Sequence, residues 1–168
     1  MVSEVVDRVT AHGGRAWAAL IGFLLAVYAV AAVGALASAD AASVYTSLDL
    51  PAWAPPAWLF GPVWTVLYAT IGVAAWYVWR RQAAPNRKPA MAWWVVQLAL
   101  NLGWTPLFFG LGAYGAALIE ILLLVVATGV TILLFSRVSK AAALLLVPYL
   151  GWVCFATALN AAIWAANG

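Results

Sequence analysis

Charged residues are scarce in this sequence. Only 8% of its 168 residues are Asp, Glu, Lys or Arg, whereas 67% are hydrophobic. A soluble domain carries roughly 25% charged residues, so a chain of this composition cannot cover a water-facing surface. The composition therefore excludes an ordinary soluble domain and predicts an integral membrane protein whose main partner is the lipid bilayer.

Cysteine and histidine are almost absent as well. The single cysteine, Cys154, excludes an internal disulfide bond. The single histidine, His12, lies in the leading segment, remote from the polar residues of the apolar runs. No Ser–His–Asp arrangement, metal-ligand spacing or glycine-rich phosphate loop is present. The sequence thus predicts no metal site, requires no cofactor and offers no general base of the usual kind.

Long apolar runs make up most of the chain. A spanning helix needs about 20 mostly apolar residues, and five stretches meet this requirement. They predict an all-α fold, an integral membrane bundle of five transmembrane helices, at about residues 16–37, 58–79, 91–110, 114–135 and 141–165. We expect residues 1–15 to form a flexible or surface-lying lead, and the long loop 38–57 to act as a lid.

Lysine and arginine occur only in alternate gaps between these runs. Arg8 and Arg15 precede the first helix, and the others lie in the loops 80–90 and 136–140. Short cytoplasmic loops are rich in such residues. We therefore expect the N-terminus and these two loops in the cytoplasm, with loop 38–57 and the C-terminus outside. Basic residues divided among short gaps do not predict nucleic-acid binding.

The first run also resembles a signal peptide, because a charged lead precedes it and the small residues "ALASADA" follow it. Its apolar part is about 20 residues long, however, whereas that of a signal peptide has 7 to 15. The length favours a retained spanning helix.

Tryptophan is abundant, with 11 residues, and two interpretations apply. An aromatic belt at the membrane surface explains those near helix ends, namely Trp17, Trp76, Trp79, Trp93 and Trp164. Trp104 and Trp152 lie well inside their runs, and Trp64 shares a helix face with Phe60 and Tyr68 by i, i+4 spacing. Aromatic faces from different helices suit a large flat ligand, although packing would also explain any single ring.

Polar side chains inside the predicted helices are further candidates. Gln97 and Asn101 share a face that Trp104 continues, and they serve either hydrogen bonding between helices or the orientation of a ligand. Glu120, the one acid within a predicted helix, is a structural residue or a proton site. The structural role is favoured, because the bundle offers no second titratable partner. For Asn160 we expect hydrogen bonding across helices.

Three motifs carry a resemblance to a known family. "WAPPAWLFGPVWTVLY", followed by "IGVAAWYVW", closely resembles the second-helix signature of the translocator protein family, the tryptophan-rich sensory proteins or peripheral-type benzodiazepine receptors. "QLALNLGWTPLFFG" and "VPYLGWVCFATALN" continue it in the third and fifth helices. The resemblance covers roughly Gly34 to Trp164. It implies a bacterial-type member in the inner or cell membrane, with a homodimer as the expected assembly.

The resemblance also implies a function. It indicates a membrane receptor or sensor that binds planar tetrapyrroles, such as protoporphyrin IX or haem, and similar hydrophobic ligands between its helices, for sensing, transport or disposal. One alternative is light- and oxygen-dependent porphyrin degradation, with Tyr45, Trp64 and Trp152 as the catalytic residues. A less favoured alternative is a proton-coupled small-molecule transporter that depends on Glu120.

The ligand-binding residues follow from the same resemblance and from the helix faces described above. We expect them to be Tyr45, Trp53, Pro55, Phe60, Trp64, Tyr68, Gln97, Asn101, Trp104, Trp152 and Ala156. The animal members end the fifth helix with a tyrosine and a following arginine, a proposed cholesterol motif. This chain has "ATALNAAIWAANG" there, with neither residue, which argues against high-affinity cholesterol binding.

Overall fold

We describe a computed structural model of the chain, which defines the backbone of residues 2–37 and 39–168 and the side chains of residues 14–37 and 39–168. The described residues form helices and no strand, which confirms the all-α prediction. The elements are α1 (Val2–Leu36), α2 (Ala41–Ser47), η1 (Ala57–Leu59), α3 (Phe60–Trp79), α4 (Arg87–Thr105), η2 (Pro106–Gly110), α5 (Tyr114–Ser136) and α6 (Lys140–Asn167).

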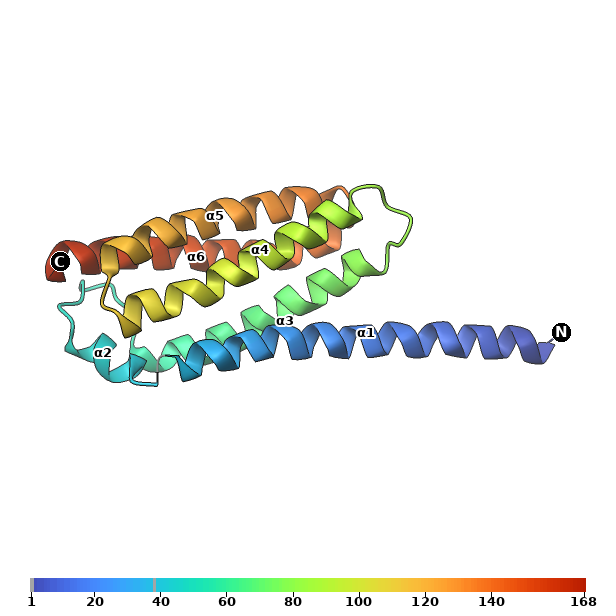
Figure 1. Cartoon of the computed structure of the whole chain (residues 1–168), viewed down its shortest axis with the longest axis horizontal. Coiled ribbons are helices and arrows are strands. Elements are labelled where there is room, and N and C mark those ends of the chain that lie inside the picture. Colours follow the sequence, from blue (N-terminus) through green and yellow to red (C-terminus); the bar gives the residue numbers. More distant parts are fainter. Residues whose placement is uncertain (1, 38) are drawn as a thin grey trace.

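The long helices lie side by side in a bundle (Figure 1). α1 packs against α3, α3 against α6, α4 against α5, and α5 against α6. The chain termini lie at opposite ends of the bundle (Figure 1). α2 and the loop around it lie at the end that also holds the C-terminus, whereas α1 extends beyond the other helices at the opposite end (Figure 1). We call the segment 39–57 the lid and the end that holds it the lid end. The opposite end is the basic end, because the basic segments 80–88 and 137–140 lie there (Figure 1).

Four helices are long and apolar enough to cross a bilayer, with spans at Gly14–Leu36, Ala57–Trp79, Tyr114–Ser136 and Lys140–Asn167. α4 contains the charged pair Arg87 and Lys88 and the amides Gln97 and Asn101, which lower its hydropathy. It nevertheless packs along α5 and contacts α1 and α3, so it belongs to the same bundle. The five long helices are those that the sequence predicts.

Some helix ends differ from the prediction. α4 begins at Arg87 rather than at residue 91, because Pro89 falls in its first turn, where a missing N–H costs nothing. The predicted loop 38–57 contains the short helix α2. The backbone of residues 2–15 continues α1, while the side chains up to residue 13 and Met1 lie outside the described residues. A flexible or surface-lying lead therefore stays a prediction.

Pro106 determines how α4 ends. Pro106 has no N–H, and the chain widens there into the π-helical turn η2, in which the N–H of Leu111 donates to the Pro106 carbonyl at 3.0 Å. Gly112 follows with φ of 60°, a left-handed conformation that glycine adopts without steric cost. This turn redirects the chain into α5. Pro148, by contrast, lies within an uninterrupted α6.

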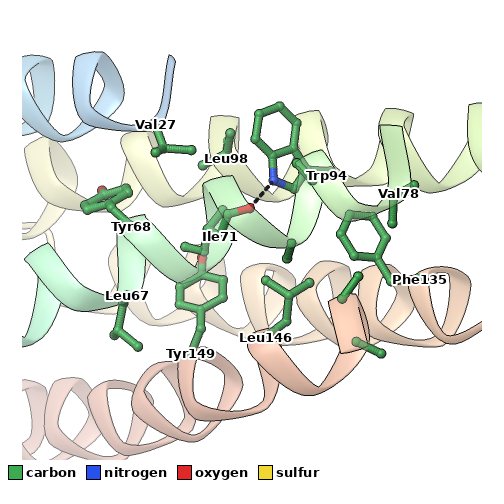
Figure 2. Packing of buried hydrophobic residues seen from close by; sticks show 14 of the residues in the cluster. Val27, Leu67, Tyr68, Ile71, Val78, Trp94, Leu98, Phe135, Leu146 and Tyr149 are labelled. Atoms are coloured by element: carbon green, nitrogen blue, oxygen red, sulfur yellow. Dashed lines mark hydrogen bonds between the residues drawn. The ribbon is translucent and has the colours of Figure 1, made fainter. Parts of the chain in front are cut away.

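Buried hydrophobic residues of α3, α4 and α6 form a core cluster. Figure 2 shows Ile71 and Val78 of α3 beside Trp94 of α4 and Leu146 of α6, all of them buried. The Trp94 indole N–H donates to the Ile71 carbonyl at 3.2 Å, which joins α4 to α3 (Figure 2). This region fixes the relative positions of the helices and thereby the walls of the space beneath the lid.

Candidate ligand-binding cavity

A cavity of about 530 Å³ lies under the lid, between α1, α3, α4, α5 and α6. Pockets of roughly 300–1,000 Å³ accommodate drug-sized ligands and cofactors. Its lining is mostly aromatic and small apolar side chains: Tyr28, Ala31, Gly34, Ala35, Ala39, Ala41, Ala42, Tyr45, Ala57, Phe60, Gly61, Trp64, Thr65, Tyr68, Asn101, Trp104, Thr105, Phe109, Ile121, Leu124, Trp152, Val153 and Ala156.

The aromatic rings of the wall contact one another across elements. Phe60 of α3 meets Tyr45 of α2 at 5.2 Å between ring centroids and Trp152 of α6 at 5.9 Å, edge to face in both cases. Trp64 lies 5.4 Å from Tyr68 with the ring planes 35° apart. Such pairs stabilise by about 0.5–1.5 kcal/mol beyond their buried area. The contacts therefore hold the rings while leaving space beside them.

Trp104 of α4 is fixed by its neighbours. Its ring stacks on Phe108 at 4.9 Å with an interplanar angle of 26°. Its indole N–H donates to Asn160 Oδ1 at 3.1 Å, and the Asn160 amide donates to the Tyr114 carbonyl at 2.9 Å. The expected role of Asn160 in hydrogen bonding across helices is thus confirmed, and that role positions a cavity tryptophan.

A buried chain of hydrogen bonds closes the polar side of the cavity. The Tyr68 hydroxyl donates to Asn101 Oδ1 at 2.6 Å, and the Asn101 amide donates to the Tyr149 hydroxyl at 3.2 Å. Asn101 is 5% exposed and Tyr149 is fully buried. These bonds join α3, α4 and α6. The Asn101 side chain therefore acts between helices, and it also borders the cavity.

The lid is held by a hydrogen bond within it and by contacts with α6. The Tyr45 hydroxyl donates to the Pro55 carbonyl at 2.9 Å, and burial raises the pKa of this phenol above its ordinary value. The Asn167 amide at the end of α6 pairs with the backbone of Asp49, accepting from its N–H at 3.0 Å and donating to its carbonyl at 3.1 Å. Trp53 meets the Phe155 ring at 5.8 Å.

Most of the residues that the sequence predicts for the site meet in this cavity. The lining includes Tyr45, Phe60, Trp64, Tyr68, Asn101, Trp104, Trp152 and Ala156. Three others do not line it. Trp53 is half exposed on the lid, and Pro55 supplies the carbonyl that anchors Tyr45. Gln97 is 1% exposed and donates to the carbonyl of Trp94 on its own helix at 2.9 Å.

Sequence reasoning missed the contribution of the first helix and the lid. Ala31, Gly34 and Ala35 of α1 line one side, and Ala41 and Ala42 of α2 close the top. The spacing of the three α1 residues at i, i+3 and i+4 puts them on one helix face, and this spacing could have indicated from the sequence that they act together. Small side chains lack the aromatic signature by which the other walls are recognised, so this face was not distinguished from ordinary helix packing.

Two polar groups near the cavity have no hydrogen-bond partner among the described residues. Both carboxyl oxygens of Glu120 are buried without one, and Oε1 lies 3.7 Å from where a Cβ on Gly103 would stand. The Trp152 indole N–H is also buried without an acceptor. Glu120 does not line the cavity, and its role as a structural or proton-carrying group stays a prediction.

Comparison with known proteins identifies the chain. Residues 22–165 match the TspO/MBR family. The chain belongs to the TspO/MBR family. This confirms the resemblance carried by the three motifs, and it agrees with the five-helix membrane bundle. The matched range contains every lining residue of the cavity.

Similar family members come from all three domains of life. The human translocator protein is 37% identical over 154 residues, covering 90% of this chain and 91% of that protein. The tryptophan-rich protein TspO of Chlorobaculum tepidum is 45% identical over 127 residues, covering 73% and 78%. The TspO of Archaeoglobus fulgidus is 41% identical over 149 residues, covering 88% and 96%.

Proposed function

We propose that this TspO/MBR family protein is a membrane receptor or sensor that binds planar tetrapyrroles, such as protoporphyrin IX, beneath its lid, for sensing, transport or disposal. The observation that carries the proposal is the cavity of about 530 Å³, whose walls bring aromatic rings from α2, α3, α4 and α6 around one space. A flat conjugated ligand gains both buried apolar area and ring stacking in such a space.

A porphyrin titration tests this proposal directly. Protein in lipid nanodiscs is titrated with protoporphyrin IX, and porphyrin absorbance and fluorescence are followed. Because each indole supplies a large stacking face, Trp64→Ala and Trp152→Ala should each weaken binding about tenfold. Trp17→Ala is the matched control, since Trp17 is 65% exposed on α1 and does not line the cavity. Equal affinity in all four proteins would refute the proposal.

Light-dependent porphyrin degradation is a second candidate. Trp64 contacts the rings of Tyr68 and Tyr149, at 5.4 and 6.2 Å, so an oxidised indole would have phenols beside it. The test is loss of porphyrin absorbance under illumination in the presence of oxygen, with a product that appears in step. The double variant Trp64→Phe and Trp152→Phe should retain binding and lose this turnover. Turnover equal to wild type would exclude the two tryptophans as catalytic residues.

The orientation that we propose places the lid outside the cell. The described basic residues belong to the first part of α1, to the segment 80–88 that ends in the first turn of α4, and to the segment 137–140 that leads into α6, all at the basic end (Figure 1). Positively charged short loops stay in the cytoplasm. Cysteines placed in the lid loop of a Cys154→Ala protein should react with a membrane-impermeant maleimide added to intact cells.

We also propose a homodimer, as the family resemblance implies. Small residues on lipid-facing helix surfaces allow close helix association in a membrane. Mass measurement of the detergent-solubilised protein by light scattering, with the detergent contribution subtracted, distinguishes a dimer from a monomer of 17.8 kDa.

A further inference from the structure

The cavity offers no charge to a ligand. None of the lining residues is Asp, Glu, Lys, Arg or His among the residues that the structure describes. The described basic residues belong to the first part of α1 and to the segments 80–88 and 137–140, and these segments lie at the basic end, opposite the lid (Figure 1). The acids Asp40 and Asp49, both exposed, lie in the lid segment itself. A carboxylate on the edge of a ligand therefore finds no cation among the lining residues, and the lid that covers the cavity carries two charges of the same sign as the carboxylate.

The cavity also offers no evident ligand to a metal ion. No methionine or cysteine side chain lines it within the described part of the chain, and Cys154 is exposed on α6. The lining tyrosines have their hydroxyl protons engaged. Tyr28 donates to the Thr65 carbonyl at 3.0 Å, and Tyr45 and Tyr68 donate as described above. Ligation of iron by a phenolate would break one of these bonds.

Tyr45 shows why ligation of iron by a lining tyrosine is unfavourable. Iron is bound by tyrosine as the phenolate. Burial raises the pKa of Tyr45, which disfavours the phenolate at neutral pH. Its hydroxyl also joins two parts of the lid, because it donates to the Pro55 carbonyl, so ligation there would break a hydrogen bond within the lid as well.

We propose that the cavity recognises the faces of a flat ring and neither its edge charge nor a central metal. It therefore takes an uncharged, metal-free macrocycle in preference to the porphyrin dicarboxylate or haem. The inference rests on the proposed function and narrows its ligand class. The physical reason is that a carboxylate loses hydration on entry without gaining a charged partner, whereas the ring faces gain the same stacking in every case.

Three porphyrins separate the contributions of the ring faces, the edge carboxylates and the central metal to binding. Protoporphyrin IX, its dimethyl ester and haemin are titrated into the full-length protein in nanodiscs. Because the ester also partitions into lipid, the reference is an Ala156→Phe protein, in which a ring is placed in the cavity; specific binding is the difference between the two proteins. The ester should bind at least as tightly as the dicarboxylate. A dicarboxylate that binds more tightly than the ester would overturn the proposal.

Haemin supplies a spectroscopic test that does not depend on affinity. Its Soret band in the wild-type protein should match that in a Tyr45→Phe protein, because no side chain ligates the iron. A ligation band that is present in the wild type and absent from Tyr45→Phe, or from the corresponding Tyr28 or Tyr68 variant, would overturn the proposal.

The lid acids give a charge-specific control. Asp40→Asn and Asp49→Asn should each tighten binding of the dicarboxylate about twofold, in low salt, and leave binding of the ester unchanged. Equal responses of the two ligands would contradict the electrostatic argument. If none of the three porphyrins binds specifically, the proposed function itself fails; if all bind but the charged or iron-bearing ones are preferred, only the present inference fails.

Discussion

The two halves of this bundle are built from similar apolar helices but differ in how closely those helices approach. In the half nearer the basic end, Gly72 of α3 lies against α1, and a Cβ there would stand 3.1 Å from Leu24 and 3.2 Å from Val27. In the half beneath the lid, a Cβ on Gly61 of the same helix would meet no heavy atom within 4 Å. The same residue type thus permits close packing in one half and borders an open space in the other.

This difference indicates how a membrane bundle can be both rigid and hollow. Close packing around Ile71, Trp94 and Leu146 fixes the helix positions. Under the lid, aromatic side chains meet edge to face at 5.2–5.9 Å, as in the Tyr45, Phe60 and Trp152 contacts, and leave the cavity open between them. The packed half supplies the stability that a vacant half does not.

Filling the packed half should have the largest effect on stability. Gly72→Val places new atoms where Leu24, Val27 and the Phe23 carbonyl already stand, so overpacking should cost about 1–3 kcal/mol. Thermal unfolding in detergent, followed by circular dichroism, measures the loss. Gly61→Val is the matched control on the same helix and should unfold close to wild type. Equal destabilisation of the two variants would contradict the comparison of the two halves.

Breaking the hydrogen-bond chain at the boundary of the two halves should have the next largest effect. Asn101→Leu leaves the buried hydroxyls of Tyr68 and Tyr149 without their present partner, at a cost of about 1–3 kcal/mol. The same unfolding measurement checks it. Gln97→Leu serves as the control, because its Oε1 has no partner among the described residues and its amide bonds only its own helix. Gln97→Leu should therefore lower stability less than Asn101→Leu.

Filling the hollow half should affect ligand binding more than stability. Ala156→Phe places a ring in the cavity, and we expect at least a tenfold loss of porphyrin affinity with an unfolding temperature near that of the wild type. Titration and thermal unfolding of one preparation measure both quantities. Ala158→Phe, on an exposed face of α6, is the control and should bind as wild type. Unchanged affinity in Ala156→Phe would argue that the ligand binds elsewhere.

Releasing the lid should have the smallest effect at equilibrium. Asn167→Ala removes the two hydrogen bonds that hold the Asp49 backbone, and exposed bonds of this kind contribute about 0.5–1.5 kcal/mol each. We expect faster porphyrin association and dissociation in stopped-flow fluorescence, with little change in affinity. Ser136→Ala at the basic end is the control, since its hydroxyl bonds only its own helix. Unchanged rates in Asn167→Ala would show that this contact does not limit access.

Much of the site was accessible to sequence reasoning because helical spacing reports helix faces. Phe60, Trp64 and Tyr68 were placed on one face by their i, i+4 spacing, and all three line the cavity. The same rule placed Gln97 with Asn101, yet only Asn101 lines it. A face of a helix in a bundle is shared among several neighbours, and spacing alone does not say which neighbour each turn of that face contacts.

The sequence by itself determined the class of this protein. Too few charges to cover a soluble surface, apolar runs of spanning length and three aromatic motifs were sufficient for an all-α membrane bundle of the TspO/MBR family. Such properties are local, since each depends on residues within one segment.

Only the tertiary structure decided where the space lies and what surrounds it. The volume beneath the lid depends on the distances between helices, which in turn depend on contacts such as Gly72 against α1 and Asn101 between Tyr68 and Tyr149. The small residues of α1 form one wall of the cavity because the distance between α1 and its neighbouring helices leaves space beside them. Contacts between segments far apart in the chain determine whether facing side chains touch or leave a cavity.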